Sequence, residues 1–230
     1  MRFQNNLIHG RLLKRYKRFL ADIILDNNTV ITAHCTNSGS MKSCLEENAE
    51  VYLSPGNNPN RKTKYTWEMI KINGSWVGIN TNNPNLIAYE AVVNKEIKQL
   101  QGYTEVKREV KWNDSRFDIF AKNNNEACFI EVKNVTYKEG VYALFPDAKT
   151  ERGLKHLKTL VEAKKKGFRT VMLYIIQRTD IEFFAPAKAI DPKYAEMLKV
   201  AFKKGIEIIP VMVKVSPTEI SILKEIPFEL

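Results

Sequence analysis

The stretch SRFDIFAKNNNEACFIEVKNVT, residues 115–136, decides both the fold and the candidate chemistry of this chain. It holds two apolar runs of strand composition separated by a cluster of asparagines, a pattern that predicts a β-hairpin. Asp118 interrupts the first run, and Glu131 and Lys133 end the second. Because side chains alternate between the two faces of a strand, Glu131 and Lys133 point to the same side. A hairpin of this length would bring Asp118 alongside Glu131.

Two carboxylates in such proximity repel one another, by about 4 kcal/mol at roughly 4 Å and an effective dielectric of about 20. A shared proton or a cation removes the repulsion. Oxygen ligands without thiolates suit Mg²⁺ or Mn²⁺ better than zinc, and a nearby lysine can orient a water or stabilise a phosphate. The set therefore predicts metal-dependent cleavage of phosphodiester bonds. A solvated Glu–Lys pair on an ordinary strand is the alternative, which the residues alone leave open.

The chain has 230 residues, of which 44% are hydrophobic, and a net charge of +10. This length suits one large domain or two small ones, with a real core. The basic excess favours a nucleic-acid partner, because each neutralised phosphate releases counterions. A basic protein without such a partner is the alternative.

Three cysteines without a CxxC pair indicate free thiols in a reducing compartment, so we expect a cytoplasmic protein. Their spacing matches no zinc module. The chain has no signal-peptide core and no apolar run of membrane-spanning length, and we expect no membrane partner.

The first 82 residues predict a small β-barrel of the oligonucleotide-binding kind. Strand-like runs cover residues 10–16, 19–25, 30–35 and 51–54, and a clear hairpin joins 64–72 to 75–79 through Asn73-Gly74. Basic residues with interleaved aromatic residues occur in two clusters, as binding of a nucleic-acid backbone with stacked bases requires. The candidate contacts are Arg11, Lys14, Arg15, Lys17, Arg18, Arg61, Lys62, Lys64 and Tyr65. The aromatic residues could equally belong to the core.

Residues 83–230 predict a mixed α/β sheet covered by helices. Asn83 as N-cap and Pro84 as first residue begin a helix whose apolar stripe includes Glu90. Two later helices are expected at 150–166 and between Asp191 and Gly205. Further strands are expected at 135–144, 170–176, 206–215 and 219–223.

The second helix presents Arg152 and Lys155 opposite its apolar stripe, with His156 at the flank. This face could bind phosphate, although a charged helix face is most often only solvated.

Longer motifs run through nearly the whole chain in order. They are GRLLKRYKRFLAD (10–22), AHCTNSGSM (33–41), NPNRKTKYTWE (58–68), VGINTNNPN (77–85), SRFD (115–118), EVKNVT (131–136), FPDAKTERGLKHL (145–157) and IDPKYAEMLKVAFKKGIE (190–207). Together they resemble the sugar fermentation stimulation protein A family. Ser38 departs from the threonine expected there, and Glu47-Asn48 replaces an expected Pro-Gly.

The resemblance implies an oligonucleotide-binding barrel, residues 1–82, followed by a PD-(D/E)XK nuclease-like domain, residues 83–230. It implies catalytic roles for Asp118, Glu131 and Lys133. It also implies that Mg²⁺ or Mn²⁺ is held by Asp118 and Glu131, with Glu90 as the helical member, and the carbonyl of Val132 could join them.

Two functions follow from these observations. One is a metal-dependent nuclease acting on DNA or RNA. The other is a non-catalytic, sequence-nonspecific DNA-binding protein linked to sugar utilisation, since such folds also serve as binding modules. A sugar-phosphate enzyme is disfavoured because no phosphate-cradling glycine loop occurs.

Overall fold

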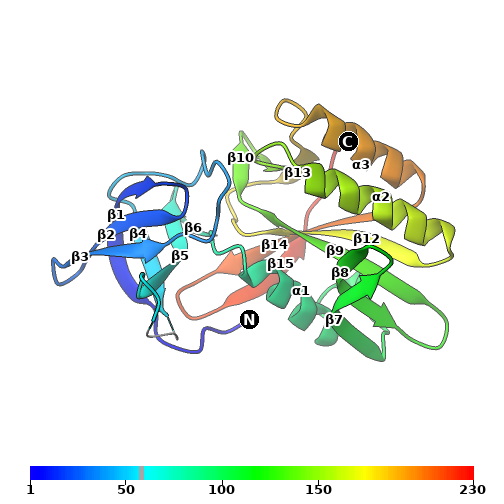
Figure 1. Cartoon of the computed structure of the whole chain (residues 1–230), viewed down its shortest axis with the longest axis horizontal. Helices are drawn as coiled ribbons and strands as arrows, with labels where there is room; N and C mark the ends of the chain where they lie inside the picture. Colours follow the sequence, from blue (N-terminus) through cyan, green and yellow to red (C-terminus); the bar gives the residue numbers. More distant parts are fainter. Residues whose placement is uncertain (57–59) are drawn as a thin grey trace.

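A computed structural model of the chain describes residues 1–56 and 60–230. A small barrel, at the left of Figure 1, is joined to a larger sheet that carries helices on both faces. The expected fold class, a barrel followed by a mixed α/β sheet covered by helices, is confirmed. The division between residues 82 and 83 stays a prediction.

The barrel is built from short antiparallel strands. They are β1 (Ile8–Tyr16), β2 (Leu20–Leu25), β3 (Val30–His34), β4 (Glu50–Pro55), β5 (Tyr65–Ile72) and β6 (Ser75–Gly78). The strand order is β3-β2-β1-β4-β5-β6, and a parallel contact between β3 and β5 closes the ring. Asn73 and Gly74 have φ angles of 51° and 73°, as the predicted two-residue hairpin turn requires.

The second part alternates helices with strands. Its elements are α1 (Asn83–Val93), a 3₁₀ turn (Lys98–Leu100), β7 (Glu105–Trp112), β8 (Ser115–Lys122), β9 (Ala127–Val135), β10 (Tyr137–Glu139), β11 (Tyr142–Phe145), α2 (Glu151–Lys165), β12 (Arg169–Ile176), β13 (Phe183–Pro186), α3 (Pro192–Lys203), β14 (Glu207–Val215) and β15 (Ile220–Glu225). The main sheet has the order β15-β14-β12-β9-β8-β7, in which β12 pairs in parallel with both β9 and β14. β10, β11 and β13 form a small separate sheet.

Alternation along the central strands gives the main sheet two apolar faces. Ile130 and Val132 of β9 pack under α1, whereas Phe129 packs under α2 and α3. Figure 1 shows α1 below the sheet and the other two helices above it. The same alternation fixes the side on which Glu131 and Lys133 lie, because they follow Phe129 at two-residue steps.

Three details differ from the sequence expectations. Residues 135–144 do not form one strand, because Gly140 with φ 56° turns β10 back onto β11. The N-cap of α1 is Asn82 rather than Asn83. Strand β7 has no apolar run, since it is an edge strand on which exposed charges discourage further pairing.

Arg178 connects the barrel to the main sheet and was not predicted from the sequence. Its side chain is completely buried, and its guanidinium donates to both carboxylate oxygens of Asp180 at 2.7 and 2.8 Å. It also donates to the carbonyl of Thr136 at 2.7 Å and to Oγ of Ser43, in the barrel, at 3.1 Å. A buried charge needs such full pairing, so this cluster holds the two parts in a fixed relation.

Two sequence expectations concern the chain as a whole. Cys35, Cys44 and Cys128 are free and buried, as expected. Over residues 1–56 and 60–230, no helix has the length and apolar character needed to traverse a bilayer.

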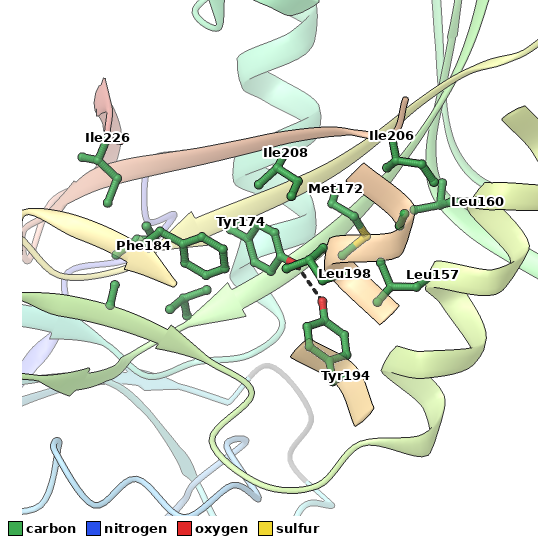
Figure 2. Packing of buried hydrophobic residues seen from close by; sticks show 14 of the residues in the cluster. Leu157, Leu160, Met172, Tyr174, Phe184, Tyr194, Leu198, Ile206, Ile208 and Ile226 are labelled. Atoms are coloured by element: carbon green, nitrogen blue, oxygen red, sulfur yellow. Dashed lines mark hydrogen bonds between the residues drawn. The ribbon is translucent and has the colours of Figure 1, made fainter. Parts of the chain in front are cut away.

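A pair of buried tyrosines links β12 to α3 (Figure 2). The hydroxyls of Tyr174 and Tyr194 lie 2.6 Å apart, and both side chains are fully buried among Leu157, Leu198 and Phe184. Each hydroxyl is the other's hydrogen-bond partner in this apolar surrounding.

Tyr194→Phe should therefore destabilise the protein by about 1–3 kcal/mol, because it leaves the Tyr174 hydroxyl buried without a partner. The double variant Tyr174→Phe/Tyr194→Phe should recover most of that loss. Denaturant unfolding of Tyr194→Phe, Tyr174→Phe and the double variant measures this, and additive losses would contradict it.

Candidate functional site

Asp118 lies at a break in the pairing of β8 with its two neighbours, β7 and β9. The register of β8 with β9 ends at Ile119, and its register with β7 skips the pair Glu109–Asp118. The carboxylate of Asp118 accepts the backbone N–H of Val132 at 2.8 Å, and it accepts the side-chain amide of Asn85 at 2.8 Å. A side chain thus replaces the ladder bond, which brings Asp118 beside Glu131 as the hairpin pattern predicted.

Glu131 is the buried centre of the site, with 1% of its surface exposed. Lys133 donates to its carboxylate at 2.5 Å, and Nδ1 of His156 from α2 contacts the same oxygen. Burial disfavours the ionised form, but the Lys133 ammonium and the hydrogen bond from His156 hold the pKa of Glu131 below its ordinary value. The side chain is therefore ionised at neutral pH.

His156 belongs to this acidic centre rather than to the outer face of α2. Arg152, one turn earlier, donates from Nε to Nε2 of His156 at 3.3 Å. An arginine only donates, so Nε2 accepts and Nδ1 carries the hydrogen that faces Glu131. A chain of contacts then runs from the exposed Arg152 to the buried carboxylate.

The pKa of Asp118 is shifted in the opposite direction to that of Glu131. Burial, followed by repulsion from Glu131, raises the pKa of Asp118 to about 6, although Lys133 and the donors Val132 and Asn85 oppose the rise. Two carboxylates that share a partly buried site with one lysine have a deficit of positive charge. A divalent cation bound by oxygen ligands would relieve it.

Glu90, expected as the helical acidic member, does not join this cluster. Its carboxylate lies 3.0 Å from the N-terminal ammonium of Met1, which also donates to Ile220 of β15. Strands β9, β12 and β14 separate β15 from β8. The α1 side chain that reaches Asp118 is Asn85, and the described part of the chain holds no group of three or more histidine, cysteine or acidic side chains arranged as metal ligands.

The basic residues of β1 and its turn divide into paired and open side chains. Arg11 donates to the carbonyl of Asn48, and Lys14 lies 3.6 Å from Asp22. Arg15 donates to the carbonyls of Arg18, Asn37 and Gly39. Lys17 and Arg18 at the hairpin tip are exposed. Arg15 therefore fixes the backbone of this region, and the prediction that these basic residues contact nucleic acid stays a prediction.

The second basic cluster is more open. Arg61 donates to the hydroxyl of Thr66 at 3.2 Å, and Tyr65 is half-buried. Lys62 and Lys64 are exposed, as is Lys155 on α2. The prediction that these residues contact nucleic acid stays a prediction.

A groove of about 440 Å³ separates the barrel from the second part. Arg18 and residues 36–39 line the barrel side, and Asn134, Thr136 and residues 144–150 line the other. Asn134 directly follows Lys133, and Thr150 caps α2 about 9 Å along the helix axis from His156. The groove therefore meets β9 at the residue that follows Lys133.

Comparison with known proteins identifies the family to which the chain belongs. The family model "SfsA N-terminal OB domain" matches residues 13–79, and "Sugar fermentation stimulation protein RE domain" matches residues 82–219. The chain belongs to the SfsA family. A sugar fermentation stimulation protein homolog of Geobacter metallireducens is 45% identical over 229 residues, 99% of both chains, and one from Pseudoalteromonas atlantica is 43% identical over 231 residues, again 99% of both.

A solved structure of the SfsA family is similar over the whole chain. Pyrococcus furiosus SfsA in complex with Ca²⁺ superposes with a TM-score of 0.89 at 26% identity, covering 100% of this chain and 98% of that one. The barrel, the sheet and their relative placement are therefore shared with that protein.

Sequence reasoning missed Asn85 and the inward orientation of His156. Asn85 lies one residue after Pro84, at the helix start where a polar side chain usually caps, so nothing in the pattern separates it from a cap. For His156 the signal existed, because it stands four residues after Arg152 and one before the buried Leu157.

Asp118 should make stability depend on pH. Because its folded pKa lies near 6, above the ordinary 3.8, the favourable contribution of the neutral carboxyl is present below pH 4 and is lost as pH rises through 6. In metal-free protein, Asp118→Asn should gain about 2–3 kcal/mol relative to wild type between pH 4 and 7.5. Denaturant unfolding across this range measures it.

A stability difference that does not change with pH would contradict this assignment. Added Mg²⁺ or Mn²⁺ should remove the wild-type loss at pH 7.5 and leave the variant unchanged.

Proposed function

We propose that this protein is a metal-dependent nuclease that cleaves phosphodiester bonds in DNA or RNA. The observation that carries the proposal is the meeting of Asp118 from β8 with Glu131 and Lys133 from β9. A groove that Arg18 and Lys149 help to line meets β9 at the next residue, Asn134. Two carboxylates and a lysine at one opening of a sheet are not needed for packing.

Asp118, Glu131 and the backbone carbonyl of Val132 would hold Mg²⁺ or Mn²⁺. The donor set fits, because Mg²⁺ is usually bound by one or two carboxylates and otherwise by waters and substrate phosphate. The raised pKa of Asp118 independently marks a site short of positive charge. When bound, the cation would polarise the phosphate and lower the pKa of a coordinated water. Glu90 is not part of this set.

The protein's own residues would orient the reactants. Lys133 keeps its ammonium 2.5 Å from Glu131, where it would position the attacking water and offset charge on the phosphate. His156 fixes the orientation of the Glu131 carboxylate, and Arg152 fixes that of His156. Arg152 and Lys155 stand on the exposed face of α2, within reach of a phosphate backbone.

The complex of Pyrococcus furiosus SfsA with Ca²⁺ supports the proposal for the metal. Ca²⁺ and Mg²⁺ both take carboxylate and carbonyl oxygens, so a relative of this fold that binds one has the ligand chemistry for the other. The barrel supports nucleic acid as the substrate, because such barrels bind oligonucleotides.

A non-catalytic DNA-binding protein is the second candidate. One observation favours it: Glu131 is already fully engaged by Lys133 and His156. It predicts salt-dependent binding with little sequence preference and no metal-dependent cleavage.

Cleavage of single- and double-stranded DNA and RNA by the purified protein with Mn²⁺ tests the first candidate. Glu131→Gln should lower the rate by about 10²- to 10³-fold, because it removes one of two charged ligands. Its affinity for the same substrate in EDTA should remain within about twofold of wild type. Glu162→Gln, the same chemical change at an exposed position on α2, is the matched control. Cleavage that persists unchanged in Glu131→Gln would defeat the proposal.

Lys62 and Lys64 should contribute to the salt dependence of binding. Replacing both with alanine should reduce the slope of log affinity against log salt by about 1.4 for a single strand, since each neutralised phosphate contributes about 0.7. Lys199→Ala, exposed on α3, should leave the slope unchanged. Equal slopes in all three proteins would show that the second basic cluster does not contact the backbone.

A further inference from the structure

The tip of the β1–β2 hairpin carries two basic residues in a strained conformation. Lys17 and Arg18, in the three-residue loop Lys17–Phe19, have φ angles of 49° and 64°, the left-handed region that residues other than glycine rarely adopt. Both side chains are exposed, so packing does not hold them there. Strain kept at an exposed position points to binding at that position.

Phe19, the next residue, exposes 49% of its surface. Its carbonyl accepts the N–H of Cys35 at 2.8 Å, which ties the backbone at this point to the end of β3. In the part of the chain that the structure describes, no other aromatic ring or cation packs against it. An aromatic ring is thus presented to solvent on a fixed backbone.

Arg15 fixes the hairpin tip to the loop at residues 36–39. The tip and this loop together form a rigid rim of the barrel. The guanidinium of Arg15 donates to the carbonyl of Arg18 at 3.1 Å and to those of Asn37 and Gly39 at 2.8 and 2.9 Å. Gly39 is packed so closely that a Cβ placed on it would lie 2.0 Å from a carboxylate oxygen of Asp147. These contacts therefore hold the hairpin tip, the loop at 36–39 and the segment before α2 at fixed distances from one another.

The rim borders the groove that meets β9 beside the acidic centre's Lys133 in the chain. Arg18 and residues 36–39 line it on the barrel side, and Asn134, the neighbour of Lys133, lines it on the other. Its volume, about 440 Å³, is in the range of small-ligand sites and too small for a duplex. A single strand has a smaller cross-section than a duplex and suits a groove of this size better.

We propose that Phe19 is a stacking platform for an unpaired base, and that the hairpin tip guides single-stranded nucleic acid into the groove. Lys17 and Arg18 bind the phosphates on either side of the stacked nucleotide. The inference deepens the proposed function by naming unpaired nucleic acid as the substrate class. Binding at Phe19 itself does not depend on cleavage.

Fluorescence anisotropy in EDTA tests this, because binding is then measured without cleavage. The probes are a labelled oligothymidylate, an oligonucleotide of the same length with abasic residues, and a blunt hairpin duplex. Phe19→Ala should weaken oligothymidylate binding about tenfold, because stacking of a base on an aromatic ring is lost. Phe19→Trp should retain binding within about threefold, and duplex affinity should not change in either variant.

The abasic probe separates stacking from charge. Wild type should bind it about tenfold more weakly than oligothymidylate, whereas Phe19→Ala should bind both equally and keep the wild-type salt slope. Phe202→Ala is the matched control, since Phe202 on α3 is 46% exposed and far in the fold from the barrel rim.

Equal weakening of duplex and single-strand binding by Phe19→Ala, or wild-type affinity for oligothymidylate in that variant, would overturn the inference. Its failure is distinct from that of the proposed function. If no protein cleaves but the stacking pattern holds, only the nuclease proposal falls. If wild type cleaves and Phe19→Ala binds normally, only the proposal that Phe19 stacks against a base is wrong.

Discussion

The negative charge of Glu131, buried in the middle of the main sheet, constrains everything around it. A buried carboxylate is costly unless it is paired and hydrogen-bonded. Lys133 supplies the charge from the same strand, and His156 supplies a hydrogen bond from α2. Thr150 caps α2 and so fixes the register of the helix. A shift of the helical register by one residue would rotate His156 away from the carboxylate of Glu131.

The surrounding fold brings a second carboxylate to this charge and forms a groove that meets the same strand, β9, at Asn134. Asp118 reaches the site because β8 parts from β9 at that point and its carboxylate takes the N–H of Val132. The fully paired Arg178 holds the barrel against the sheet, so the groove between them keeps its width. A rigid groove and a strained basic hairpin are properties of a binding surface, and the acidic centre on the adjoining part of β9 gives the protein a candidate chemistry.

Local pattern was sufficient for most of the fold. The Asn73-Gly74 turn, the capping of α3 by Asp191 and the buried run of β12 each follow from one stretch of chain, and the structure confirms them. Features that depend on distant contacts could not be found this way. Glu90 sits in an apolar stripe in the sequence, but it pairs with the N-terminal ammonium, and Arg178 has no signal because its partners in the barrel are far away in the chain.

A crystal of the protein soaked in Mn²⁺ and measured for anomalous scattering tests the central claim most directly. The account predicts one cation between the carboxylates of Asp118 and Glu131, beside the carbonyl of Val132, with the Lys133 ammonium moved away from Glu131. A cation peak elsewhere, or none at saturating Mn²⁺ with Glu131 still bonded to Lys133 and His156, would contradict it and leave a basic protein that binds nucleic acid without cutting it.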